Sequence, residues 1–405
     1  MTAENQTLLI VLTLAVLAPV IVELIPRVAI PAIVLEIVLG ILVGPQGLQW
    51  AEPNQQLEML SRFGMMFLFF LAGLEIDFVA IRGRPIVWAG LGWLVSVGIA
   101  MAAGWGLQAA GVIVSGVVVA TAFTTTALGA LIPILRDAGT LNSKFGSFVS
   151  AAGAVGEFGP IVLISVALST EGGSMSLLFI AVFAAITLSC AYLAATTRPL
   201  PVIRLLKRKL HTSAQLPIRV SLLVLAALVV LTKQFGLDSV LGAIAAGVVV
   251  SLACRDHAGE AVRHKLEAIG FGFFIPMFFI ATGMKFDLHA LTATSAALLR
   301  VPLFLGLFLL ARGVPVWLCR RDLPRGDWLP LALMSATALP LVVAVTEIGT
   351  ATNRMKPETA AALVGAGMVS MLVFPALALT LQSSTTSPAD ADPPRPDGQE
   401  EAVKY

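Results

Sequence analysis

Apolar stretches of about twenty residues follow one another along almost the whole chain, and they constrain its fold more than any other feature. A helix needs about 20 mostly apolar residues to cross the hydrocarbon core of a bilayer. Charged residues make up only 12% of the chain, whereas soluble domains carry roughly 25%. The sequence therefore predicts an all-α polytopic membrane protein.

Charged residues, prolines and glycines divide the apolar sequence into about thirteen predicted transmembrane helices. Their expected bounds are 6–25, 29–45, 57–77, 85–109, 111–135, 145–169, 175–196, 216–235, 237–254, 265–286, 295–318, 327–350 and 358–382. No basic segment precedes the first, so we expect a retained helix and not a cleaved signal peptide. Residues 383–405, rich in Pro, Asp and Ser, are expected to form a disordered cytoplasmic tail.

Lys and Arg are concentrated in every second predicted loop. Cytoplasmic loops carry the excess of basic residues, so we expect the N-terminus outside and the C-terminus in the cytoplasm. The most basic loop, residues 198–219, is read first as an ordinary connection between two halves, with contact to anionic lipid headgroups as the alternative.

Two pairs of similar segments indicate an internal repeat. MFLFFLAGLEID (66–77) resembles MFFIATGMKFD (277–287), and TTTALGALIPI (124–134) resembles SATALPLVVAV (335–345). The spacing between the two segments is almost the same in both copies. The copies begin seven predicted helices apart, so they run in opposite directions through the bilayer. Inverted repeats are typical of secondary transporters, whose sites lie near the midplane at interrupted helices.

The fifth and twelfth predicted helices are the candidates for interruption. Gly129 permits unusual backbone angles, and Pro340 removes a backbone donor. Freed carbonyls and nearby hydroxyls can then coordinate a desolvated monovalent cation. The polar residues at this depth are Thr124, Thr125, Thr126, Ser335 and Thr337. For each residue alone, a bond back into its own helix remains the alternative.

Glu157 is a single acid in the apolar run AAGAVGEFGPIVL, residues 151–163. Acids inside a membrane usually mark ion or proton pathways. Arg312 is the basic residue placed well inside a predicted span, and it needs an acid or a carbonyl nearby. Burial and a nearby positive charge act in opposite directions on the ionisation of Glu157, so it can titrate in the working pH range. A permanent Glu157–Arg312 bridge is the structural alternative.

Other acids are weaker candidates. Glu36 and Glu347 lie within predicted spans, and each could line an aqueous funnel or contact a neighbouring helix. Glu75 and Asp77 end the third span and are expected to be interfacial anchors. The sequence contains no nucleotide-binding, redox or protease motif. We therefore expect no cofactor, no metal other than the transported cation, and no nucleic-acid partner.

Several segments together resemble the monovalent cation:proton antiporter-2 family, which includes the Kef-type and NapA-like exchangers on the NhaA fold. They are PAIVLEIVLGILVGP, FLFFLAGLEIDF, the Thr-rich fifth helix, GFGFFIPMFFIATGMKFDL and the basic residue of the eleventh helix, and the resemblance covers residues 5–382. It implies a homodimer with broken, crossing helices and an elevator motion. It also implies a scaffold (6–77 and 216–286), a mobile core (85–169 and 295–382) and a linker helix (175–196).

The resemblance assigns roles to three residues. The second acid of the family's acid pair falls on Glu157, its core lysine on Arg312, and its first acid or Asn on Gly156. With one carboxylate, the site holds one proton or one cation. The sequence thus predicts an electroneutral one-for-one exchange of Na⁺ or K⁺ for H⁺ in a prokaryotic plasma membrane.

Two other transport functions stay open. An organic-anion transporter on a related inverted-repeat fold would bind its substrate at Arg312, and a cation channel would pass cations without obligatory proton counterflow. An enzyme is not expected, because no nucleophile, base and orienting group form a set.

Overall fold

A computed structural model describes residues 3–24, 31–75, 83–141, 143–168, 215–235, 239–254, 257–292 and 294–383, and all their regular structure is helical. The first helices are α1 (Ala3–Leu24), α2 (Ala32–Val43), α3 (Gln55–Glu75), α4 (Arg84–Ala109), α5 (Gly116–Phe123), α6 (Leu128–Asp137) and α7 (Lys144–Leu168). After residues 169–214 come α10 (Leu216–Gln234), α11 (Ser239–Ala253), α12 (His257–Ile269), α13 (Ile275–Lys285) and α14 (Leu288–Thr292). The last are α15 (Ser295–Gly313), α16 (Trp328–Ala336), α17 (Pro340–Ala351) and α18 (Pro357–Ser383).

The prediction of an all-α membrane fold is confirmed. Within the described ranges, nine helices are long and apolar enough to cross a membrane, and three shorter apolar segments accompany them. The predicted bounds agree with these helices to within a few residues, with one exception. The helix predicted for residues 265–286 begins earlier in the structure, at His257. The predicted span 175–196 lies outside the described residues, so the count of thirteen stays a prediction.

The early start of the helix predicted for residues 265–286 has a local cause. In the structure this helix begins at His257 and continues through a π-helical turn (Gly270–Phe274) into α13. The charged side chains that ended the apolar run satisfy one another, since Nε of Arg263 donates to Glu267 across one helical turn at 2.8 Å. Hydropathy alone does not predict such a polar extension of a membrane helix, because its residues are not apolar.

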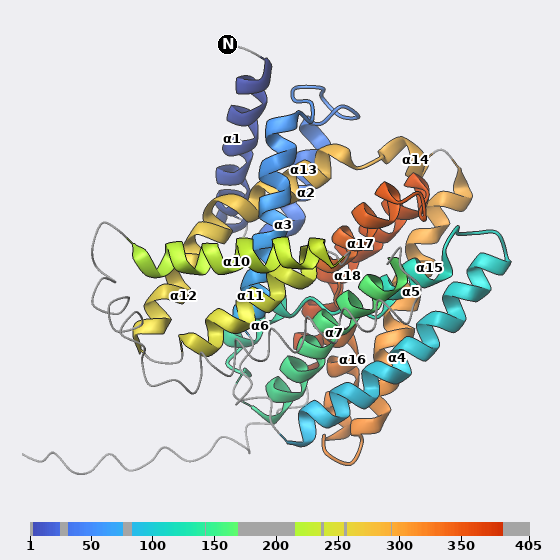
Figure 1. Ribbon diagram of the computed structural model, residues 1–405. Coiled ribbons are helices and arrows are strands. Elements are labelled where there is room, and N and C mark those ends of the chain that lie inside the picture. The colour runs from blue at the N-terminus through green and yellow to red at the C-terminus, as the bar shows by residue number, and fades with distance from the viewer. Residues whose placement is uncertain are drawn as a thin grey trace, which may run out of the picture.

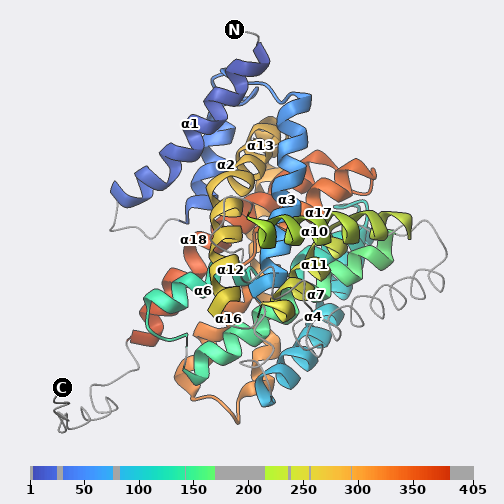
Figure 2. The same cartoon turned by 60° about the vertical axis from the view of Figure 1, so that its left-hand side comes forward.

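The helices pack as two groups (Figure 1). In the first bundle, α3 packs against α11 and α13, α2 against α13, and α10 against α11, while α1 lies at the edge against α2 (Figure 2). In the second bundle, α4 packs against α5 and α7, α6 packs against α7, and α15, α16 and α17 all pack against α18. Side chains of both bundles contribute to one hydrophobic core.

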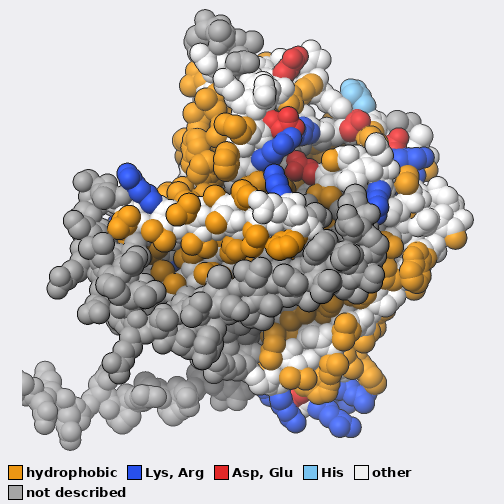
Figure 3. Space-filling view, in the orientation of Figure 1, with side chains coloured by type: hydrophobic (Ala, Val, Ile, Leu, Met, Phe, Trp, Pro, Cys, Tyr) orange, Lys and Arg blue, Asp and Glu red, His pale blue; other side chains and the backbone are white. Residues whose placement is uncertain are grey.

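The outer surface of the protein suits a lipid environment. Figure 3 shows broad areas of exposed apolar side chains between two charged ends. Lys and Arg gather at the lower end of this view, whereas acidic and basic side chains mix at the upper end. Large exposed hydrophobic residues include Leu94, Trp105 and Leu223. Apolar surface on this scale, flanked by polar ends, is what a bilayer-embedded protein presents.

Two helices are interrupted, as the sequence predicted. The first break separates α5 from α6 at residues 124–127, and the second separates α16 from α17 at residues 337–339. Both breaks are fully enclosed by protein. Pro340 occupies the first turn of α17, where its missing N–H costs nothing. Irregular backbone at membrane depth is tolerated only where protein or water satisfies it.

Candidate functional site

The two helix breaks cross and bond to each other. The backbone N–H of Ala127 donates to the carbonyl oxygen of Thr337 at 2.8 Å, and the hydroxyl of Thr126 donates to the carbonyl oxygen of Ser335 at 2.5 Å. One bond links backbone to backbone and the other links a side chain to backbone, and together they join two segments more than two hundred residues apart in sequence. The breaks predicted from Gly129, Pro340 and the threonines, and the crossing that the family resemblance implies, are therefore present in the structure.

The predicted hydroxyl ligands also bond back into their own helices. Thr124 and Thr125 donate to the carbonyl oxygens of Thr121 and Ala122 at 2.8 and 2.9 Å, and Thr337 donates to Leu333 at 3.1 Å. A hydroxyl that donates its hydrogen keeps lone pairs on its oxygen. Within the described residues, no backbone N–H donates to the carbonyl oxygen of Thr124 or Thr125. The break thus offers oxygen atoms suited to a cation.

The helix that carries Glu157 joins this crossing through the residue before it. Pro160 has no N–H to bond to the carbonyl of Gly156, four residues earlier. That oxygen instead accepts from the backbone N–H of Thr126 at 3.0 Å. Proline in α7 therefore frees the carbonyl that ties α7 to the first break, one residue from Glu157.

Gly156 allows the close approach of three elements. A Cβ atom at this position would lie 2.6 Å from Nη2 of Arg312 and 2.6 Å from Oγ1 of Thr126. Both distances are shorter than real Cβ contacts show. Arg312 and the first break thus occupy the space that an Asp or Asn side chain at this position would need.

Arg312 is a buried cation that binds the second bundle together. It is 4% exposed and stands at the end of α15. Nε donates to Oγ1 of Thr126 at 3.0 Å and to the carbonyl oxygen of Ser335 at 3.3 Å. Nη1 and Nη2 donate to Oγ of Ser96 at 3.4 Å and to the carbonyl oxygen of Ala152 at 2.9 Å. The guanidinium therefore connects α4, α7, α15, α16 and the first break.

Glu157 is 5% exposed and lies on α7 beside the crossing. Within the described part of the chain, no donor reaches its carboxylate and it forms no ion pair, with Arg312 or any other residue. A permanent Glu157–Arg312 bridge is thus not the arrangement seen here. A buried carboxylate without a partner is costly when ionised, so this position suits a group that takes up a proton or a cation.

Glu75 departs from its expected place as an interfacial anchor. It ends α3, yet its Oε2 would lie 3.8 Å from a Cβ atom on Gly129, in the first turn of α6. The first bundle therefore places an acid against the second bundle near the crossing. Hydropathy does not predict this contact with the second bundle, because an acid at the end of a span resembles an interfacial anchor. Asp77, the other predicted anchor, lies outside the described residues.

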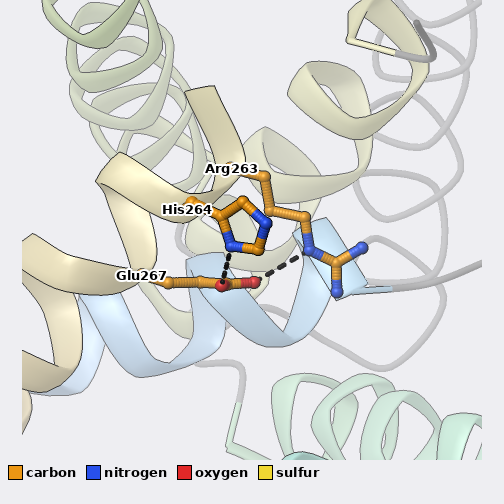
Figure 4. A network of polar contacts seen from close by, with 3 residues as sticks. All are labelled: Arg263, His264 and Glu267. Carbon is orange, nitrogen blue, oxygen red and sulfur yellow. Dashed lines mark hydrogen bonds and ion pairs between the residues drawn. The ribbon is translucent and has the colours of Figure 1, made fainter. Parts of the chain in front are cut away.

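A charged cluster stands on α12, which contacts α3, the helix that ends at Glu75. Figure 4 shows Glu267 between Arg263, whose Nε donates at 2.8 Å, and His264, whose Nδ1 lies at 3.3 Å. Arg263, Glu267 and Arg136 all act electrostatically on Glu75. Charged side chains from both bundles thus face one another at this end of the boundary between them.

Ser370 of α18 supports the second break and was not predicted. Its hydroxyl accepts from the backbone N–H of Ala338 at 3.1 Å and donates to the carbonyl oxygen of Ala338 at 2.9 Å. A serine pairing with a distant break leaves no pattern in a single sequence. Ser335, on α16, contributes its carbonyl to the crossing, and its hydroxyl has no partner within the described residues.

The two remaining acids lie away from the crossing. Glu36 is 5% exposed on α2, which packs mainly on α1 and α13. One of its carboxylate oxygens has no hydrogen-bond partner within the described chain. Glu347 is half-buried on α17 and lines a cavity between α13, α17 and α18. The structure does not bring Glu36 to Glu157, and it places Glu347 on the half of α17 that lies farther from the second break.

Comparisons with known proteins agree with this architecture. Similarity to YjbQ of Bacillus subtilis (strain 168), a candidate Na(+)/H(+) antiporter by name, is 26% identity over 91% of this chain and 62% of that protein. An Na(+)/H(+) antiporter of Enterococcus hirae is 29% identical over 64% of this chain and 68% of its own length. The chain thus spans about three fifths of YjbQ and two thirds of the Enterococcus protein.

Among solved structures, the sodium proton antiporter MjNhaP1 from Methanocaldococcus jannaschii at pH 8 superimposes with a TM-score of 0.68. The match covers 95% of this chain and 97% of that one at 17% identity, and it shows a shared fold. Residues 11–379 match the family described as sodium/hydrogen exchanger, transmembrane. The chain belongs to the transmembrane sodium/hydrogen exchanger family.

Proposed function

We propose that the protein exchanges a monovalent cation, Na⁺ or K⁺, for H⁺ across a membrane, with Glu157 as the group for which the two ions compete. The observation that carries the proposal is a buried, unpaired carboxylate beside the crossing of two helix breaks. A carboxylate can hold a proton or a cation, and only one of them at a time. The names of relatives as Na(+)/H(+) antiporters support the same activity.

The cation would be bound by Glu157 together with oxygen atoms of the break. Thr124, Thr125 and Thr337 keep lone pairs free, and the carbonyls of the first break add further oxygens. Thr126 is less suited, because its hydroxyl oxygen already accepts from Arg312. Gly156 offers no side chain as a ligand, and Ser335 would contribute through its hydroxyl.

The proposed stoichiometry is one cation for one proton. Glu157 is the carboxylate beside the crossing. The family's first acid corresponds to Gly156, and Arg312 occupies the space that a side chain at Gly156 would need. A guanidinium does not release its proton inside a protein. Arg312 therefore serves as a fixed charge that holds the crossing together, and Glu157 alone would carry the exchanged ion.

We further propose that the second bundle moves as a core past the first bundle, which acts as a scaffold and forms a homodimer. The site residues Glu157, Arg312 and Thr337 all belong to the second bundle, so they would travel together. The basic end of the protein in Figure 3 would face the cytoplasm of a prokaryotic cell, in agreement with the positive-inside rule.

The test is proton flux in proteoliposomes under an imposed ΔpH, with Na⁺, K⁺ and Li⁺ added in turn and the membrane potential clamped or stepped. We expect cation-dependent, voltage-insensitive flux in the wild type. Glu157→Gln, which keeps the shape of the side chain, should abolish it while the protein stays folded. Cation-dependent proton flux in this variant would sink the assignment of Glu157, and voltage-sensitive flux would refute the one-for-one stoichiometry.

The alternatives gain no support from the site. Organic-anion binding at Arg312 would need an exposed guanidinium, but this side chain is 4% exposed and each of its nitrogens already donates to an oxygen of the protein. A channel would need a continuous path, and both helix breaks are enclosed by protein.

A further inference from the structure

A cavity of about 310 Å³ lies between the two bundles, at the end of the protein opposite the connection from α15 to α16, Val314–Asp327. In Figure 1 the outer ends of α13 and α17 and the short helix α14 lie together at this end. A single water needs roughly 10–15 Å³ of such volume, so the cavity has room for several waters. Its polar lining residues are Thr282, Lys285, Asp287, Thr346, Glu347 and Thr350.

Among the charged side chains that line the cavity and their ion-pair partners, acids outnumber bases. Lys285 pairs with Glu58 at 3.5 Å, and Glu58 also pairs with Arg62 at 3.8 Å. These three groups act on Glu347 from the first bundle. Asp287 and Glu347 add two further acids, so three acids face two bases. The positive charge of Lys285 is thus already shared with Glu58 and does not cancel the carboxylate of Glu347.

The cavity also contains a buried hydroxyl that lacks a partner. Thr282 is 7% exposed, lines the cavity, and its Oγ1 makes no hydrogen bond within the described residues. Thr346 and Thr350 donate to carbonyl oxygens of α17 at 2.8 Å each, which leaves lone pairs on their oxygens. An unpaired buried polar atom costs free energy. A ligand that interacts with the hydroxyl oxygen of Thr282 would remove this cost, so its binding is favoured.

The hydroxyls of Thr282, Thr346 and Thr350 and the carboxylate of Glu347 offer oxygen atoms, the type of ligand that hard cations prefer. Within the described ranges, no group of three or more His, Cys, Asp or Glu side chains is arranged to hold a metal ion. That disfavours a dehydrated divalent ion and favours a monovalent cation that keeps part of its water shell.

The cavity is connected to the helix break by α17. Glu347 lies seven residues beyond Pro340, where α17 begins at the second break. At about 1.5 Å per residue this is roughly 10 Å. Thr282 stands on the first bundle and Glu347 on the second, so the two sides of the cavity belong to the two parts that are proposed to move.

We propose that this cavity is a second monovalent-cation site, in which Glu347 and Thr282 collect the hydrated cation on one face of the membrane before it reaches Glu157. The proposal rests on the exchange activity proposed above. It assigns to this chain a vestibule that serves one face only, the face that carries Lys285 and Arg62.

The experiment compares right-side-out and inside-out membrane vesicles that contain wild type, Glu347→Gln or Thr282→Val. Proton flux is measured against Na⁺ and K⁺ concentration at constant ionic strength. In vesicles that present the Lys285 face to the added cation, Glu347→Gln should raise the apparent KM at least about threefold, since a carboxylate attracts a cation over a few ångströms. The maximal rate, and the KM from the opposite face, should change little.

Two variants serve as controls. Glu52→Gln removes an acid from the exposed segment between α2 and α3 without touching the cavity, and its KM should match the wild type. Thr282→Val removes the unpaired hydroxyl at nearly constant volume, so it should fold normally and still raise the KM from the same face. It keeps the test decisive if Glu347→Gln fails to fold.

Each outcome separates this proposal from the exchange activity. A wild type without cation-dependent flux would overturn both. Wild-type flux with an unchanged KM in Glu347→Gln and Thr282→Val would overturn the vestibule alone. An equal KM rise from both faces, or a loss of maximal rate without a KM change, would also overturn it, because Glu347 would then act on exchange itself.

Discussion

Replacing Gly156 by Ala tests the packing at the crossing most directly. The added Cβ would lie 2.6 Å from Nη2 of Arg312 and from Oγ1 of Thr126, whereas ordinary contact begins at 3.4 Å. The neighbours must therefore retreat by about 0.8 Å, the difference between these two distances. Such a shift strains the bonds of Arg312 to Ala152 and of Thr126 to Gly156, 2.9 and 3.0 Å long.

The magnitude follows from two opposing effects. Overpacking a tight interior costs about 1–3 kcal/mol, while Ala in place of Gly inside a helix stabilises by about 1 kcal/mol. The net expectation is a destabilisation of about 0–2 kcal/mol. Gly98→Ala in α4 is the matched control, because a Cβ there meets nothing within 4 Å. It should be neutral or stabilising by up to about 1 kcal/mol.

The assay is thermal unfolding of both purified variants in the same detergent, followed by proton flux in proteoliposomes. Gly156→Ala should melt below Gly98→Ala and exchange cations more slowly, because the displaced groups contact the residue next to Glu157. If Gly156→Ala matched Gly98→Ala in both melting temperature and flux, the close approach of α7, Arg312 and the first break would be refuted.

Two further predictions address the surroundings of the site. Ser370→Ala leaves the buried N–H of Ala338 without its 3.1 Å acceptor and should destabilise the protein by about 1–3 kcal/mol, measured by thermal unfolding; an unchanged melting temperature would mean that the second break does not depend on α18. Glu75→Gln keeps the shape of the side chain but removes its charge at the first turn of α6, where Oε2 would lie 3.8 Å from a Cβ atom on Gly129; the pH profile of exchange should therefore shift, and an unmoved profile would show that Glu75 and Glu157 act independently.

The sequence predicts the depth of a residue in the membrane better than the direction in which its side chain points. Apolar runs located the spans, and Gly129, Pro340 and the threonines located the two breaks, because these residues change what the backbone can do. Lipid and protein interior are equally apolar, so hydropathy does not reveal which face of a helix meets another helix. Glu75 illustrates this limit, since its place at the end of α3 indicated an anchor.

The partners of Arg312 were predictable in kind and not in identity. A buried guanidinium needs oxygen acceptors, and the sequence offered Glu157 as the obvious one. The structure satisfies it with Thr126, Ser335, Ser96 and Ala152, most of them backbone or hydroxyl oxygens. Every residue has a carbonyl oxygen, so no sequence pattern distinguishes the carbonyls that a folded chain brings to one arginine.

The separation of Arg312 from Glu157 has a consequence for coupling. If the two charges formed an ion pair, the empty site would be neutral by itself and could cross the membrane without a load, which would uncouple cation from proton. Arg312 instead donates to neutral oxygens, and Glu157 has no such partner within the described residues. An ionised and empty Glu157 is then costly to carry through an apolar boundary, whereas a proton or a cation removes that cost. In the exchange proposed above, tying the arginine to neutral acceptors would thus favour movement of the loaded site over movement of the empty one.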